Sequence, residues 1–306
     1  MSTPPVVQPG LVVVDKPAGL TSHDVVARLR KIFGTRKVGH AGTLDPMATG
    51  VLVVGIERAT KLLGYLALER KAYLATIRLG ASTTTDDAEG ELIAEQDGSA
   101  VPEDGILAGI AALTGPINQV PSAVSAVKID GKRAYQRVRD GEDVQLPPRP
   151  VVVHRFDLLA LRREERWTEL DVLVDCSSGT YVRALARDLG AGLGVGGHLR
   201  ALCRTQVGPF GLALARTLDA LKQDPTLSLD LDAAVALAFP RREVSAGEAA
   251  AFANGQRLPA CGIAGTYAVF GPDGKAVALA TEQDNAADGK PAVRGAARSV
   301  LILAVG

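Results

Sequence analysis

One aspartate lies in a setting that suits chemistry on a bound ligand. Residues 39–52 read GHAGTLDPMATGVL, so Asp45 stands in a glycine-punctuated bend just before an apolar strand. Pro46 biases Asp45 away from helical dihedrals, and Gly42 and Gly50 permit a close approach by a ligand. An ionised carboxylate held there can attack carbon or remove a proton. The alternative is an ordinary turn with a solvated aspartate, because Asp-Pro pairs usually mark turns.

The other chemistry-bearing residues indicate neither a metal centre nor a hydrolytic triad. The four histidines lack HExxH spacing, and the three cysteines lack any CxxC arrangement. Ser177-Ser178-Gly179 lacks the G-x-S-x-G setting of a nucleophilic serine. The glycine-rich run 190–197 follows a predicted helix where a dinucleotide site needs a strand. We therefore expect no metal and no cofactor.

Hydrophobic periodicity predicts the elements that must position Asp45. The expected elements are a buried strand over 11–14, a helix begun by Thr21 or Ser22, a strand over 51–54 and a helical segment over 57–66. A further helix over 181–189, capped by Ser177 or Ser178, places Arg183 near its N-terminus, where a cation opposes the helix dipole and gains from a carboxylate partner. An exposed arginine paired loosely with Asp188 is the alternative, and such surface pairs contribute only about 0 to 1 kcal/mol.

The order of elements predicts an α+β fold with a mainly antiparallel sheet, because strands and helices alternate irregularly. Segments 71–79 and 168–174 alternate apolar and polar residues, as half-covered strands do. Between them, about 120–150, we expect an insertion with a strand over 124–129, a turn at 130–131 and a short helix near 134–139. After Pro240, an Ala-rich helix over 246–254 and Gly-rich segments indicate a separate unit. The predicted domains are therefore 1–239 and 240–306.

Charge alone does not identify a partner. Lys plus Arg and Asp plus Glu both total 34, so the formal net charge is zero. Five basic residues between Asp24 and Asp45, with no acidic residue among them, could face phosphates or form a solvated helix face. A second basic cluster over 128–139 is weaker because acidic residues dilute it. The first ten residues do not resemble a signal peptide and no 18-residue apolar run occurs, so we expect a soluble cytoplasmic protein.

Three extended motifs occur in a fixed order. They are KPAGLTS at 16–22, GHAGTLDPMATGVL at 39–52 and CSSGTYVR at 176–183. Together they closely resemble the TruB family of tRNA pseudouridine synthases, over roughly residues 10–210. The resemblance implies the pseudouridine synthase fold, with a central mixed sheet and a catalytic cleft. It also implies a small C-terminal, PUA-like, β-rich domain that binds RNA.

The resemblance also implies roles for individual residues. Asp45 matches the essential catalytic carboxylate, and Arg183 is expected to contact it. Tyr73 matches an aromatic residue that stacks on the target uracil, although a buried strand tyrosine is the competing explanation. We assign Tyr181 to the same pocket wall and Lys16 to support of the active-site loops. His40 is expected beside the RNA, and the other RNA-binding candidates are Arg36, Lys37, Lys128, Lys132 and Arg133.

The activity implied is isomerisation of uridine 55 in the T loop of tRNA to pseudouridine, after flipping of the base. The route at Asp45 stays open between attack on C1′, addition to C6 and glycal elimination. We expect a monomer that binds the T arm without membrane, guide RNA or protein partner. Two rivals are an RNA-binding or folding-helper protein with a structural carboxylate, and a relative that modifies ribosomal RNA with guide partners.

Overall fold

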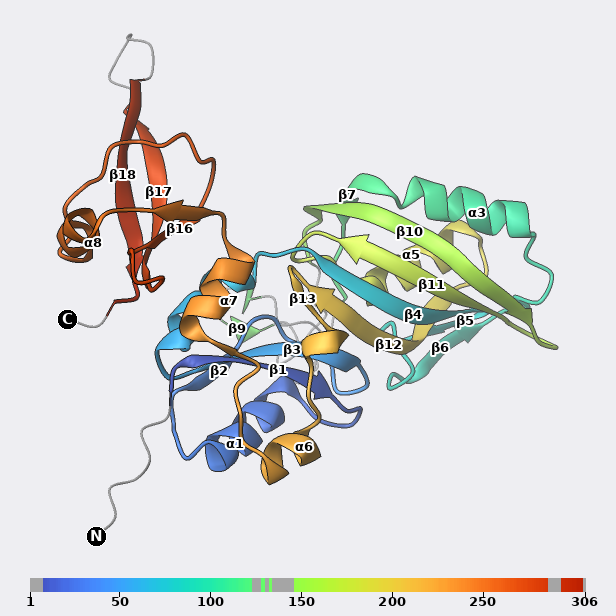
Figure 1. Cartoon of the computed structure of the whole chain (residues 1–306). Coiled ribbons are helices and arrows are strands. Elements are labelled where there is room, and N and C mark those ends of the chain that lie inside the picture. Colours follow the sequence, from blue (N-terminus) through green and yellow to red (C-terminus); the bar gives the residue numbers. More distant parts are fainter. Residues whose placement is uncertain (1–7, 123–127, 130–131, 134–145, 286–292, 305–306) are drawn as a thin grey trace.

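The computed structural model describes residues 8–122, 128–129, 132–133, 146–285 and 293–304. Within this part of the chain a large mixed sheet carries most of the structure (Figure 1). Its path is β14-β1-β3-β12-β4-β11-β10-β7, with β2 paired to β3 and β13 paired to β12. The β12–β3 pair is parallel and the other pairs are antiparallel. The expected α+β class and mainly antiparallel sheet are confirmed.

The strands of the large sheet are β1 (Gly10–Lys16), β2 (Val38–His40), β3 (Thr49–Ile56), β4 (Lys71–Leu79), β7 (Gly115–Gln119), β10 (Arg149–Arg163), β11 (Thr168–Cys176), β12 (Gly197–Val207), β13 (Phe210–Gly211) and β14 (Leu229–Asp230). Two hairpins lie outside it, β5 (Ala81–Thr83) with β6 (Leu92–Glu95) and β8 (Lys128–Ile129) with β9 (Lys132–Arg133). The predicted strands at 11–14 and 51–54 are the centres of β1 and β3, which extend further at both ends.

Helices lie on one face of this sheet. They are α1 (Ser22–Ile32), α3 (Glu103–Ala112), α5 (Val182–Gly192) and α6 (Leu218–Gln223). Their apolar residues share one core with the inward side chains of β4, which include Ala75 and Ile77. Figure 1 shows α1 and α6 beside β1 and β3, and α3 beside β10. The alternation read from the sequence of β4 therefore identified the covered face correctly, and Leu74 of the opposite face is 43% exposed.

A second core covers the other face around β1, β3 and the β12–β13 turn. It is built by the 3₁₀ helix η1 (Glu57–Leu62), α2 (Leu63–Leu66) and α7 (Leu231–Ala238). The segment 57–66 was expected to be one helix, but its first six residues form the tighter 3₁₀ type. A short 3₁₀ turn, η2 (Leu212–Leu214), precedes α6.

The C-terminal residues form a small separate β sheet. Its order is β15-β16-β17-β18, and α8 packs against β17 and β18. The bounds are β15 (Arg241–Glu243), α8 (Ala246–Ala253), β16 (Tyr267–Phe270), β17 (Ala276–Asn285) and β18 (Val293–Ile302). This arrangement agrees with the expected small β-rich domain.

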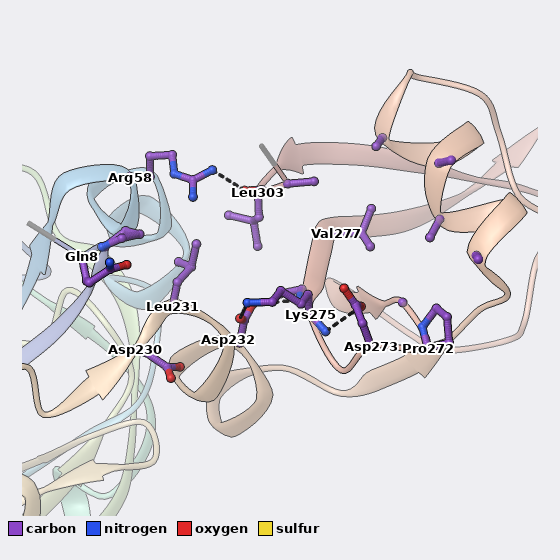
Figure 2. A pocket seen from close by; sticks show the side chains of 18 residues that line it. Gln8, Arg58, Asp230, Leu231, Asp232, Pro272, Asp273, Lys275, Val277 and Leu303 are labelled. Atoms are coloured by element: carbon purple, nitrogen blue, oxygen red, sulfur yellow. Dashed lines mark hydrogen bonds and ion pairs between the residues drawn. The ribbon is translucent and has the colours of Figure 1, made fainter. Parts of the chain in front are cut away.

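Direct contacts join the small sheet to the large one. Arg58 donates to the carbonyl of Leu303, and the Tyr65 hydroxyl donates to the carbonyl of Val300. Asp232 accepts from the backbone N–H of Ala276. A cavity of about 820 Å³ lies between the two units, and Figure 2 shows Arg58 and Asp232 at its wall.

The insertion lies mostly outside the described residues. Between residues 123 and 145 the structure describes the two short strands β8 and β9, and the rest of the strand, turn and helix expected over 124–139 lies outside the described residues. No helix in the described part of the chain is long and apolar enough to cross a membrane.

Candidate active site

Asp45 lies in the loop between β2 and β3, and three buried side chains hold this loop from different elements. Ser22, at the start of α1, accepts from the N–H of Leu44 and donates to its carbonyl. Lys16 of β1 donates to the carbonyl of Pro46 at 3.1 Å. Arg204 of β12 donates to the carbonyls of Gly42 and Thr43 at 3.1 and 3.2 Å. The loop is therefore fixed on both sides of the carboxylate.

Arg183 forms a two-point ion pair with Asp45. Its Nε lies 2.9 Å from Asp45 Oδ2, and its Nη2 lies 3.3 Å from Oδ1. The arginine side chain is 5% exposed while that of Asp45 is 36% exposed. The carboxylate thus balances a buried cation and still faces open space. The alternative of an exposed Arg183 paired with Asp188 is wrong, because Arg187 takes that partner.

A second carboxylate, which sequence reasoning missed, shares Arg183. Asp87 Oδ2 lies 3.6 Å from Arg183 Nε, and both side chains are only 5% exposed. The carbonyl of Thr85 accepts from Arg183 Nη1 at 2.6 Å. These two residues belong to the polar run TTTDDAEG at 83–90, which reads as an ordinary turn. Only the sheet topology brings it to the arginine.

The helix that carries Arg183 begins without help from the serines before it. Tyr181 is the N-cap residue of α5 and makes no side-chain capping bond. Instead the buried Gln119 of β7 accepts from the N–H of Tyr181 at 2.8 Å and donates to its carbonyl at 3.1 Å. The expected cap was therefore wrong. Ser177 accepts from the N–H of Val152, and Ser178 donates to the carbonyl of Ala67.

A pocket of about 330 Å³ opens in front of Asp45. Its wall contains Tyr73 and Tyr181, Arg183, and the strand residue Leu202. Tyr73 is 7% exposed, and burial raises the pKa of its hydroxyl. This volume lies at the lower end of the range for small-molecule sites. It is large enough for one nucleobase with part of its sugar.

Lys16 does not line this pocket. It is fully buried, and its amine donates to the carbonyls of Pro17, Leu20 and Pro46. Burial lowers the pKa of Lys16 to about 8, and the negative charge of Asp45 opposes that shift. This geometry suits the expected support of the loops.

Of the expected RNA-binding residues, His40, Arg36 and Lys37 do not line the pocket. His40 is at the end of β2 and meets His23 of α1 edge to face, with ring centroids 5.5 Å apart. Arg36 and Lys37 are exposed, and Lys37 pairs with Glu57 at 3.4 Å. Lys128, Lys132 and Arg133 are in the β8–β9 hairpin, and the structure does not describe their side chains.

Sequence reasoning also missed two cations that border the pocket, Lys71 and Arg204. Lys71 opens β4 and is 7% exposed, and Arg204 in β12 is 1% exposed. Both residues lie in strands, where the alternation of the sequence predicts which face of the sheet a side chain is on but not which residues it contacts. Among the described residues, no group of His, Cys, Asp or Glu is arranged to hold a metal ion.

Comparisons with known proteins agree with this architecture. The family model "TruB family pseudouridylate synthase (N terminal domain)" matches residues 30–182. The model "tRNA pseudouridylate synthase B C-terminal domain" matches 183–234, and "tRNA Pseudouridine synthase II, C terminal" matches 239–292. A chain of a Cbf5-Nop10-Gar1 complex superposes with a TM-score of 0.72 at 28% identity, covering 96% of this chain and 84% of that one.

Curated relatives match over nearly the whole length. The chain is 62% identical over 274 residues to tRNA pseudouridine synthase B of Nocardia farcinica, covering 90% of each protein. It is 59% identical over 288 residues to the protein of the same name from Rhodococcus jostii, covering 94% of each. The chain belongs to the TruB family of pseudouridine synthases.

Proposed function

We propose that this protein converts uridine 55 in the T loop of tRNA to pseudouridine, with Asp45 as the essential catalytic carboxylate. The observation that carries this proposal is the Asp45–Arg183 ion pair at a pocket large enough for one nucleobase. The choice of tRNA as substrate rests on the relatives, which are named tRNA pseudouridine synthase B. An RNA-binding or folding-helper protein would not need an ionised carboxylate facing such a pocket.

The proposed reaction breaks the bond between uracil N1 and ribose C1′, turns the base and joins C5 to C1′. The C5 proton is released and N1 gains a proton, so no atom is gained or lost overall. The reaction therefore needs no redox cofactor and no group donor. Asp45 acts at the sugar or the base, Arg183 orients its carboxylate, and the ring of Tyr73 stacks on the everted uracil. Tyr181 closes the wall next to Arg183.

Recognition of the T arm is assigned to groups around the pocket. His40 lies beside the loop of Asp45 and can replace contacts of the flipped base. Exposed Arg36 and Lys37, the β8–β9 hairpin and the C-terminal domain from about residue 240 provide contacts to phosphates. Such contacts weaken as salt rises, because binding releases counterions.

We further propose that the protein acts as a monomer without guide RNA or protein partner, in the cytoplasm where its tRNA substrate is found. The Cbf5-containing structure is a complex with other proteins, so this point needs its own test. Purified protein alone should convert a tRNA transcript. A strict requirement for an added guide or protein would favour the guide-dependent rival.

Asp45→Asn tests the catalytic assignment. The variant should fold and bind T-arm RNA while forming no detectable pseudouridine. Asp224→Asn is a matched control, because Asp224 is 65% exposed and pairs with Arg216 away from the pocket. Joint loss of thermal stability and RNA affinity in Asp45→Asn, or wild-type binding without any conversion, would contradict the proposal.

A further inference from the structure

Two buried cations at the pocket, Lys71 and Arg204, lack the carboxylate partners that buried charges usually have. The Lys71 amine donates to the carbonyls of Ala67 and Glu69, at 2.9 and 2.8 Å. The Arg204 guanidinium donates to the carbonyls of Val51, Thr43 and Gly42. Neither forms a salt bridge to an acidic side chain within the described residues. Retaining an uncompensated buried charge is costly, so such a charge needs an explanation.

Both cations reach the same point of the Asp45 loop. A methyl group built on Gly42 would lie 3.5 Å from Lys71 Cε and 3.7 Å from Arg204 Nη1. Among the described residues that line the pocket, three are cations, Lys71, Arg183 and Arg204, and one is a carboxylate, Asp45. Since Arg183 is occupied by Asp45 and Asp87, the other two make the pocket electropositive.

We propose that Lys71 and Arg204 stabilise the negative charge that uracil acquires when its bond to the sugar breaks. This inference rests on the proposed function. When N1–C1′ breaks heterolytically, the electron pair stays on N1 and spreads onto the carbonyl oxygens O2 and O4. Intact uridine carries no such charge. A preorganised positive field therefore favours the cleaved state over the bound substrate, which is the condition for catalysis.

Binding of an RNA phosphate is a poorer explanation of the same charges. Lys71 and Arg204 are 7% and 1% exposed, so a phosphate would have to enter the pocket in place of the base. Exposed basic residues such as Arg36 are available for phosphates outside it. The burial of the pair points to a charge on the base itself.

The protonation of Lys71 fits this role at neutral pH. Burial and, to a smaller extent, the positive charge of Arg204 lower the pKa of Lys71 to about 8, while Cys176 and Glu69 act in the opposite direction. The amine therefore still carries its proton at pH 7. Burial raises the pKa of the neighbouring Tyr73 hydroxyl, and raises that of the Cys176 thiol to about 11, so neither group loses its proton before Lys71 does.

The test compares two leaving groups under single-turnover conditions with saturating protein. T-arm transcripts carry uridine or 5-fluorouridine at the target, and consumption of the starting nucleoside is measured after digestion. Fluorine withdraws electron density, so the fluorinated base needs less help to leave with its electron pair. Lys71→Gln keeps a donor for the carbonyls of Ala67 and Glu69 but removes the charge, and Lys71→Met is the second variant. Lys222→Met, an exposed lysine of α6, is the control.

Lys71→Gln should slow consumption of uridine by about 10²-fold, as loss of a preorganised charge-stabilising donor does. It should slow 5-fluorouridine by a clearly smaller factor, and Lys71→Arg should restore most of the rate. Equal slowing of both bases, or a change confined to RNA affinity and its salt dependence, would overturn the inference alone. Wild-type protein that consumes neither base would overturn the proposed function as well.

Discussion

The shared arginine allows a quantitative prediction about which of its two carboxylates stabilises the fold. At an effective dielectric constant of about 20, unit charges 3.6 Å apart attract by about 5 kcal/mol, which describes the deeply buried Arg183–Asp87 contact. Asp45 is nearer, at 2.9 Å, but its side chain is 36% exposed, so solvent screens the attraction. Exposed pairs commonly contribute about 1 kcal/mol or less.

Double-mutant cycles would separate the two contacts. The variants are Arg183→Met, Asp87→Asn and Asp45→Asn, singly and in pairs, with free energies of unfolding from urea titrations. Arg183→Met should cost about 3 to 5 kcal/mol, because it leaves a buried carboxylate without its cation. After desolvation is offset, the coupling of Arg183 to Asp87 should be about 3 kcal/mol and that to Asp45 about 1 kcal/mol.

The same variants report on catalysis with a different ranking. Asp45→Asn should remove conversion while changing stability little, and Asp87→Asn should lower both stability and rate because it frees Arg183. An Arg183–Asp45 coupling equal to or larger than the Arg183–Asp87 coupling would refute the reasoning, since burial would then not decide between the two pairs.

Three further predictions concern the pocket. Tyr73→Phe should retain substantial activity if ring stacking is its main contribution, and complete loss in a folded variant would implicate the hydroxyl instead. Gly50 has a φ of 93°, and a methyl group there would lie 2.3 Å from the carbonyl oxygen of Arg204, so Gly50→Ala should cost at least about 2 kcal/mol in urea titrations. Gly179→Ala, with a φ of 87° and no neighbour within 4 Å, should cost only about 1 kcal/mol, and equal costs would contradict the collision. The rate of the wild-type protein should fall as pH rises through about 8, where Lys71 loses its proton. In Lys71→Arg the rate should fall less over the same pH range. The same decrease in both proteins above pH 8 would count against a charged Lys71.

Much of the framework could be read from local patterns. Alternation in β4 identified its covered face, and Thr21 caps α1 with Asp24 in a capping box, as the polar start of that helix predicted. Glycines and the Asp-Pro pair marked the loop of Asp45. These features depend on neighbouring residues, so a single sequence contains them.

Long-range features were not accessible in the same way. The parallel pairing of β12 with β3 places Arg204 beside Gly50, 154 positions away in sequence, and no spacing rule predicts that meeting. Asp87 reaches Arg183 from a polar turn. The serines expected as helix caps serve other elements, because Ser178 donates to a carbonyl 111 positions earlier. Such contacts follow from topology and not from local propensity.

The two hydrogen bonds between Gln119 and Tyr181 link the start of the insertion to the active site. Gln119 is the last residue of β7, directly before the segment that departs from the sheet, and Arg187 of α5 donates to the carbonyl of the next residue, Val120. The start of the insertion is therefore hydrogen-bonded to α5 at Tyr181, two residues before Arg183, and at Arg187. A displacement of the chain at Gln119 would therefore reach the N-terminus of α5, and with it Arg183, through the two hydrogen bonds between Gln119 and Tyr181.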